Sequence, residues 1–135
     1  MITYELSFGK VILIQDDIAE VIVDEGVEFD IVMVGEYHEF LIDHLKHPFS
    51  LLINKLHSYS YTFEAQQYLG DLTEINAMAV VSYTKASEIT TKSLASMPKE
   101  STWDLKIFKK REIALKWLEV KQAIIGIRIS PMQKD

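Results

Sequence analysis

The strongest constraint on the fold is an uninterrupted apolar run at residues 77–81, Ala-Met-Ala-Val-Val. The run is too short to form a helix of its own, and its two closing valines favour extended backbone. Apolar character on both sides of a strand is typical of a parallel sheet that is covered on both faces. The sequence therefore predicts that residues 77–81 form a central strand of such a sheet.

Helical and extended patterns alternate around this run. Strands are predicted at residues 49–53, 77–81 and 103–107, and helices at residues 63–69, 84–97 and 113–120. Thr62 is the predicted N-cap of the first of these helices, and Gly70 is its C-terminal stop. Short chains with this alternation form right-handed crossovers over a parallel sheet.

The N-terminal part of the chain has a different pattern. Three segments with strand character, at residues 2–8, 11–14 and 19–23, are separated by turns at residues 9–10 and 16–17. They predict an antiparallel three-stranded meander. Asp30 can cap a helix at residues 31–46, which Pro48 ends. The predicted fold class is α/β, with a mixed sheet in which an N-terminal antiparallel meander is followed by parallel strands with crossover helices.

Composition limits the function classes. The 135 residues are enough for one domain, and 48% hydrophobic with 25% charged residues argues against general disorder. The net charge of −6 disfavours binding to nucleic acid or to an anionic membrane surface. Because the chain has no cysteine, disulfides and thiol chemistry are excluded. No leader pattern and no membrane-length apolar run are found, so we expect a soluble cytoplasmic protein.

The end of the chain departs from the helical pattern. Residues 122–129 have strand character, with Ile125, Ile127 and Ile129 on one face. We therefore expect a domain at residues 1–121 and a strand-like C-terminal tail at residues 122–135. Such a tail can cover a sheet edge, and our hypothesis is a homodimer in which it takes part.

Four local phrases, at residues 22–30, 54–60, 80–84 and 108–118, resemble small bacterial STAS-like proteins. The predicted element order is also that of STAS domains, the sulfate-transporter and anti-sigma-factor-antagonist modules. The likeness extends to about Glu119, and its most recognisable part is the closing Ala-x-x-Trp-Leu at residues 114–118. The resemblance implies a STAS-like fold and a non-catalytic regulatory or protein-interaction module.

In the antagonist branch, the resemblance implies that a partner kinase phosphorylates a serine at the helix start after a central strand, which blocks binding to that kinase. By position, Ser58 or Ser60 would be the phosphoacceptor. The family phrase, Asp-Ser followed by Ser and Gly, is replaced here by a Ser-Tyr-Ser-Tyr phrase. We therefore interpret residues 54–62 as a partner contact surface first, and as a phosphoacceptor or anion site second.

Polar residues follow two of the predicted strands, at the ends where open α/β sheets bind ligands or partners. The residues that we expect to contact a partner or a ligand are Asn54, Lys55, Ser58, Tyr59, Ser60, Tyr61, Thr62, Tyr83 and Thr84. The charge of Lys55 and the amides of the following helix start could receive an anion. Because the loop lacks the glycines that let a backbone wrap a phosphate, an ordinary capped loop is favoured.

Other polar clusters favour structural roles. The helical spacing keeps His38, His44 and His47 from converging, which disfavours a metal site, and His38 is predicted to be a hydrogen-bonded residue at the margin of the core. The basic cluster of Lys106, Lys109, Lys110 and Arg111 is interpreted as a solvated edge. No nucleophile elbow, Walker loop or dinucleotide glycine pattern occurs, so we expect neither catalysis nor a cofactor.

The alternative function is a binding domain for a small ligand, nucleotide or lipid, with a pocket at the carboxyl ends of the central strands. The similar architecture of CRAL-TRIO lipid-exchange domains suggests it. A closed apolar cavity between helices and sheet would favour ligand binding, whereas a packed core with an exposed apolar patch would favour partner binding.

Overall fold

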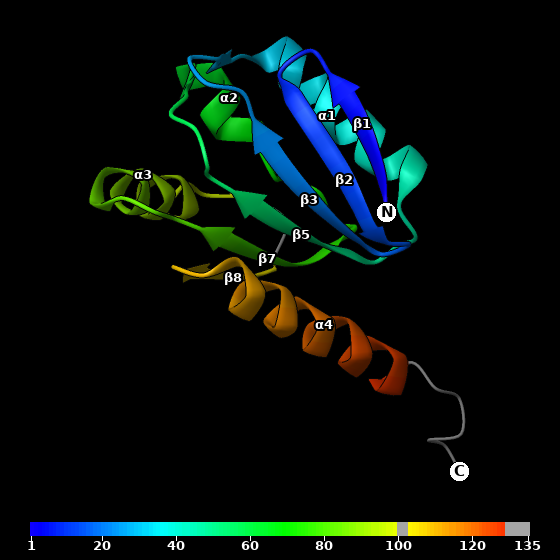
Figure 1. Ribbon diagram of the computed structural model, residues 1–135. Helices are drawn as coiled ribbons and strands as arrows, with labels where there is room; N and C mark the ends of the chain where they lie inside the picture. Colours follow the sequence, from blue (N-terminus) through cyan, green and yellow to red (C-terminus); the bar gives the residue numbers. More distant parts are fainter. Residues whose placement is uncertain (100–102, 129–135) are drawn as a thin grey trace.

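The computed structural model describes residues 1–99 and 103–128, and its main feature is a six-stranded sheet with helices on both faces (Figure 1). The strands of the sheet are β1 (Ile2–Leu6), β2 (Gly9–Gln15), β3 (Ile18–Val23), β5 (Phe49–Asn54), β7 (Ile75–Val81) and β8 (Asp104–Phe108). The helices are α1 (Ile31–His44), α2 (Phe63–Tyr68), α3 (Lys85–Ala95) and α4 (Arg111–Arg128). Two short strands, β4 (Glu28–Phe29) and β6 (Ser60–Tyr61), pair with each other outside this sheet.

The sheet combines antiparallel and parallel strands in the order β1-β2-β3-β5-β7-β8. β1, β2 and β3 pair antiparallel, and each later neighbour pairs in parallel. The predicted α/β fold, a meander followed by parallel strands with crossover helices, is therefore confirmed. β7 lies between two strands, as its continuous apolar run predicts, and β8 lies at the sheet edge.

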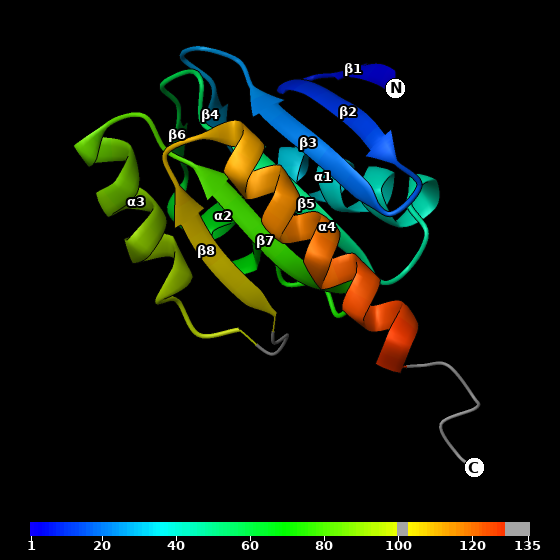
Figure 2. The ribbon, with the colours of Figure 1, turned by 60° about the horizontal axis from the view of Figure 1, so that its bottom comes forward.

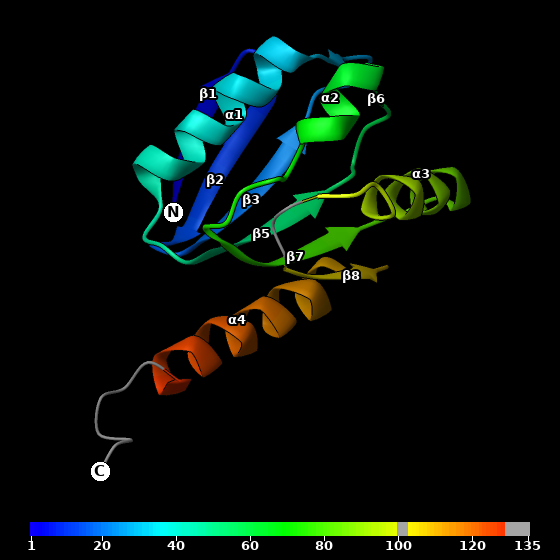
Figure 3. The same cartoon turned by 180° about the vertical axis from the view of Figure 1, so that it is seen from behind.

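The parallel strands are added in sequence order, always at the same edge. Right-handed crossovers that advance in one direction must all lie on the same face of the sheet. α1 and α2 lie across that face (Figure 3), and α3 covers its far end, beyond β5 and β7 (Figure 1). The opposite face is left to α4, which packs against β5 and β7 (Figure 2).

α1 follows its sequence signals closely. The Asp30 carboxylate accepts a hydrogen bond from the Met33 amide at 2.9 Å, which confirms the predicted N-cap. Its buried face consists of Val34, Tyr37, Phe40 and Leu41. Phe40 packs edge-on against Tyr4 with ring centroids 5.0 Å apart, so the first strand of the meander also contacts this face.

The predicted strand character of residues 122–128 is wrong, because α4 continues through Arg128. Gln122 accounts for the continued helix, because its side chain lies on the face of α4 that is buried against the sheet. Its side-chain oxygen accepts from Ser50 at 2.6 Å, and its nitrogen donates to Asp17 at 2.8 Å. Only a helical backbone directs this amide onto the sheet while Leu118 packs in the core one turn earlier. The rest of the predicted tail, residues 129–135, lies outside the described residues.

The first turn of the meander lies earlier than predicted. Leu6 pairs with Gly9, so the turn is at residues 7–8 and Gly9 already belongs to β2. Phe8 is buried against Phe29, with ring centroids 4.8 Å apart, so this turn is anchored by an inward-facing aromatic ring. Gly9 has φ of 155°, and a Cβ there would lie 2.2 Å from the Ile22 carbonyl oxygen, so no larger residue fits.

Candidate functional site

The end of β5 divides the predicted contact residues between the two faces of the sheet. Side chains alternate along a strand, so Ile53 and Lys55 point to the α1 side and Asn54 points to the α4 side. Asn54 is only 6% exposed and contacts Glu20. Lys55 lines a cavity on the other side. The sequence-predicted residues therefore contribute to two separate structures rather than to one surface.

We call the cavity on the α1 side the Lys55 cavity. It has a volume of about 80 Å³ and an almost entirely apolar lining. The sheet contributes Val21, Val23, Ile53, Met78, Val80 and Leu105; helix α3 contributes Thr91, Leu94 and Ala95; and Phe29, Tyr37, Lys55, Tyr59, Tyr61, Leu69, Gly70, Lys99 and Trp103 complete the lining. It lies at the carboxyl ends of β5 and β7, the predicted place for a ligand pocket.

The cavity exists because two helices cover this end of the sheet incompletely. α2 has six residues and buries only Ala65. α3 buries only Thr91, and its many serines and threonines give it low intrinsic helix propensity. Between α2 and α3, parts of strands β5, β7 and β8 are therefore not covered by either helix. A short crossover helix followed by a loosely packed one thus leaves a space that side chains do not fill.

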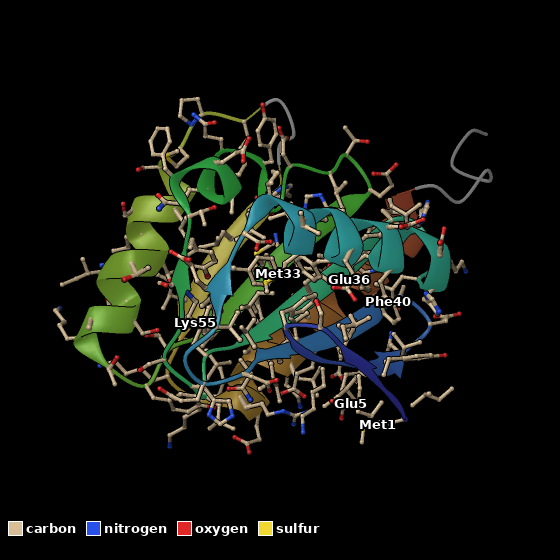
Figure 4. The ribbon with its side chains drawn as sticks, turned by 90° about the horizontal axis from the view of Figure 1, so that it is seen from above. Met1, Glu5, Met33, Glu36, Phe40 and Lys55 are labelled. Atoms are coloured by element: carbon tan, nitrogen blue, oxygen red, sulfur yellow. The ribbon has the colours of Figure 1, made fainter. Side chains whose placement is uncertain are left out.

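Lys55 is the main polar feature of the cavity wall. Its ammonium group donates to the Tyr61 hydroxyl at 3.1 Å and lies 5.3 Å from the ring centroids of both Tyr59 and Tyr61. None of the ion pairs between described residues involves it. Burial lowers the pKa of Lys55 to about 8, so most of the amine still carries its charge at neutral pH. In Figure 4, Lys55 lies on the α3 side of the molecule, away from Phe40 in α1.

The two tyrosines form a short chain of hydroxyls with the lysine. Tyr61 donates to Tyr59 at 3.3 Å, and their rings meet edge-on with centroids 5.4 Å apart. Burial raises the pKa of Tyr59 and also that of Tyr61, so both phenols are neutral hydrogen-bonding groups. β6, which carries Tyr61, is held by pairing with β4. This pairing was not predicted, and it fixes the aromatic wall of the cavity.

The opposite face of the sheet has a buried polar network centred on Glu20, which is 3% exposed. Arg111 donates to both carboxylate oxygens at 2.7 to 3.1 Å, and Asn54 donates at 2.9 Å. Burial would raise the pKa of Glu20, but the hydrogen bonds from Arg111 and Asn54 and the Arg111 charge lower it below its ordinary value. Tyr83 joins by donating to the Asn54 oxygen at 2.9 Å.

This network corrects the interpretation of the basic cluster as a solvated edge. Lys106, Lys109 and Lys110 are exposed, as expected, whereas Arg111 is tied to a strand 91 positions earlier in the sequence. The available signal was Glu20 itself, the single charged residue among the apolar residues of β3. A charge on a strand that is covered on both faces needs a partner.

The serines and threonines of the predicted site have ordinary structural positions. Thr62 caps α2 by accepting from the Ala65 amide at 3.1 Å, as predicted, and Thr84 caps α3 by accepting from the Ser87 amide at 3.0 Å. Ser58 and Ser60 are exposed. The Ser58 amide donates to the Glu25 carboxylate at 3.0 Å, which holds the loop against the turn after β3. These contacts are those of a capped loop.

His38 has the role that the sequence predicts, that of a half-buried residue in a hydrogen bond. The Nε2 atom of His38 accepts a hydrogen bond from the Gly70 amide at 3.1 Å. Burial lowers the pKa of His38 to about 4, and the charge of Asp71 raises it by a smaller amount. The Gly70 carbonyl in turn accepts from the Trp103 indole at 2.9 Å. His38 therefore fixes one end of the cavity lining. No group of three or more metal-ligating side chains is placed to hold a metal within residues 1–99 and 103–128.

Within the part of the chain that the structure describes, no helix has both the length and the apolar character required to cross a bilayer. Comparison with protein-family models, with curated protein sequences and with solved structures found no match to this chain. The geometry of the Lys55 cavity and of the polar network is therefore the basis on which a function is assigned.

Proposed function

We propose that this domain binds a small, largely apolar ligand in the Lys55 cavity and does so without catalysis. The observation that supports the proposal is the cavity itself, with its apolar lining and few polar groups, at the carboxyl ends of the central strands. Small-molecule sites have this combination. The cavity is partly open to solvent, so a ligand that enters it would displace water from apolar side chains and gain binding free energy in proportion to the apolar area that it covers.

The test uses 1-hexanol, a neutral probe, titrated into the isotopically labelled protein and followed by NMR. We expect the largest shifts at amides of Val80, Leu94 and Leu105, which line the cavity. Leu105→Phe places a larger side chain in the cavity wall, which reduces the free volume of the cavity and should weaken binding. Ile107→Phe, two positions along the same strand and outside the lining, is the matched control and should bind as the unaltered protein does. Shifts confined to other surfaces would contradict the proposal.

A second candidate function follows from the STAS-like resemblance: a regulatory module that binds a protein partner through the loop after β5. It is favoured by two exposed apolar side chains at the same end of neighbouring strands, Leu56 at 57% and Tyr83 at 49% exposure. Ser58 and Ser60 in the same loop are the proposed phosphoacceptors. A phosphate on Ser58 would lie next to Glu25, whose charge repels it and opens the loop. The proposed setting for this role is the cytoplasm.

The partner function is tested by co-purification from the native cell with mass spectrometry of bound proteins and of phosphorylated Ser58 or Ser60. Leu56→Asp should abolish capture of a specific partner, whereas Ile113→Asp, an equally exposed position on α4, should not. If both variants retain the same proteins, the loop is not the contact surface.

The homodimer through the C-terminal tail remains a separate proposal. A chain ending near Lys121 would not test it cleanly, because it would lack the buried Gln122 and lose contacts that hold α4 on the sheet. A chain ending at Arg128 retains these contacts. A native mass that halves on removing residues 129–135 would support the dimer, and an unchanged mass would refute it.

A further inference from the structure

The ammonium group of Lys55 has fewer hydrogen-bond and ion-pair partners among the described residues than it can bind. An ammonium group has three N–H donors. Among the hydrogen bonds of the described residues, Lys55 donates only to Tyr61. The cation is otherwise stabilised by two aromatic faces, at 5.3 Å each, and no carboxylate among the described residues pairs with it. Lys55 is half-buried, and a cation that is partly removed from water is stabilised by an anionic partner. The cavity thus contains a positive charge whose partner is supplied by no described side chain.

The other titratable groups around the cavity do not provide this partner. Tyr37 from α1 and Tyr59 and Tyr61 from the β6 segment are neutral, because burial raises the pKa of each. Burial lowers the pKa of Lys99, the second cation in the lining, and the charge of Asp71 offsets part of this shift. Lys55 is therefore the group in the lining toward which an anion of the ligand would be drawn.

The hydroxyl chain determines the geometry of that anion. Tyr61 accepts a hydrogen bond from Lys55 and donates one to Tyr59. The hydroxyl proton of Tyr59 is therefore available for a further acceptor. An oxygen placed beside Lys55 and Tyr59 could accept from both groups. A group with one negative charge neutralises the single ammonium. A dianionic phosphate would leave a net charge in an apolar cavity, at a high desolvation cost.

We propose that the ligand of the Lys55 cavity is a small monocarboxylic acid, whose carboxylate pairs with Lys55 and Tyr59 and whose apolar part lies against Val80, Leu94 and Leu105. This inference rests on the proposed ligand-binding function and specifies the chemistry of that ligand. The volume of about 80 Å³ limits the apolar part to a short chain. The cavity is partly open to solvent, so the end of a six-carbon chain can extend from its mouth.

The experiment compares hexanoate with 1-hexanol, which has the same chain length and no charge. Each is titrated by NMR into the unaltered protein, into Lys55→Met and into Lys110→Met. Lys110 is an exposed lysine at the start of α4 and serves as the matched control. We expect hexanoate to bind at least about tenfold more tightly than hexanol to the unaltered protein and to Lys110→Met, the effect of a hydrogen bond to a charged group. Lys55→Met should lose this preference while still binding hexanol.

The outcomes separate the two proposals. If hexanol binds in the cavity and hexanoate binds no more tightly, the acid chemistry is refuted and the ligand-binding function stands. If neither probe shifts the cavity amides, both proposals fail. If Lys55→Met retains the preference for hexanoate, Lys55 is not the anion partner. A purely structural role for Lys55 would leave the affinity ratio of the two probes unchanged, whatever the effect of the substitution on stability.

Titration with pH provides a second readout. Because the pKa of Lys55 is about 8 in the free protein, the affinity for hexanoate should be constant between pH 6 and 7 and should fall above pH 8 by at least about tenfold in total, which is the preference that the charge provides. The affinity for 1-hexanol should show no such fall until the tyrosines titrate. An affinity for hexanoate that is independent of pH between 7 and 10 would overturn the assignment.

Discussion

Replacing Lys55 with methionine should stabilise the protein, although it removes a hydrogen bond. Burial lowers the pKa of Lys55 from 10.5 to about 8, and each unit corresponds to about 1.4 kcal/mol, so the buried charge costs about 3 kcal/mol at neutral pH. The variant loses the bond to Tyr61, about 1 kcal/mol, and attraction to two tyrosine rings, about 0.5 kcal/mol each. The expected net gain in free energy of unfolding is about 1 kcal/mol.

Equilibrium urea unfolding, followed by circular dichroism, measures this difference at pH 7 and at pH 10. The folded-state pKa of Lys55 lies below its unfolded value, so the unfolded chain binds more protons between pH 8 and 10.5. The stability of the unaltered protein therefore rises with pH through that window, and the advantage of Lys55→Met shrinks. The tyrosines, including Tyr37, Tyr59 and Tyr61, and Lys99 are present in both proteins, so their titration largely cancels in the comparison.

Lys110→Met is the control, because an exposed lysine contributes within about 0.5 kcal/mol. A Lys55→Met variant that is less stable than the unaltered protein at pH 7 would refute the reasoning, since Lys55 would then be held by favourable interactions that the structure does not contain. An advantage that stays constant up to pH 10 would equally show that the cost does not come from the buried charge.

Three further predictions concern the supporting structure. Arg111→Met should destabilise the fold by about 3 kcal/mol, because Glu20 is left buried without its cation. The loss should diminish at acid pH or in the Glu20→Gln, Arg111→Met double variant, and urea unfolding of both variants and of the unaltered protein checks this. The pKa of His38 is lowered to about 4, so stability is retained above pH 6.5 and falls by about 2 kcal/mol as pH drops to 5; His38→Gln should lack most of this fall in the same assay. Gln122→Leu should cost about 2 kcal/mol by thermal or urea unfolding, because it leaves polar partners such as Ser50 buried; a neutral effect would mean that α4 does not depend on this contact.

Much of the fold could be predicted because its signals are local. Asp30 and Thr62 cap helices through hydrogen bonds to amides three positions later, and the apolar run in β7 belongs to a strand that is covered on both faces. The end of the chain could not be predicted in this way. Residues 124–127 are rich in isoleucine and have strand character, but the preceding turn is held in helical form by Gln122, whose partners lie 46 to 105 positions away.

The geometry around the predicted contact residues could not be predicted from the sequence. Asn54 and Lys55 are adjacent in the sequence, yet one belongs to the Glu20 network and the other to the cavity. Alternation along a strand implies this separation, but only once β5 is known to continue to Asn54. How far Lys55 is removed from solvent depends on α3, which is distant in sequence, and on β6, which is close in sequence but is held in place by its pairing with the distant β4.

The sequence by itself determined the α/β class, the order of the elements and the loops that hold the candidate residues, because periodicity and capping act over a few neighbouring positions. The tertiary structure alone decided that the crossover helices share one face, that a short α2 and a sparsely packed α3 leave a cavity there, and that Lys55 enters it with no described carboxylate as partner. Burial and charge pairing depend on which segments meet in space, and these are the quantities that give Lys55 its proposed role.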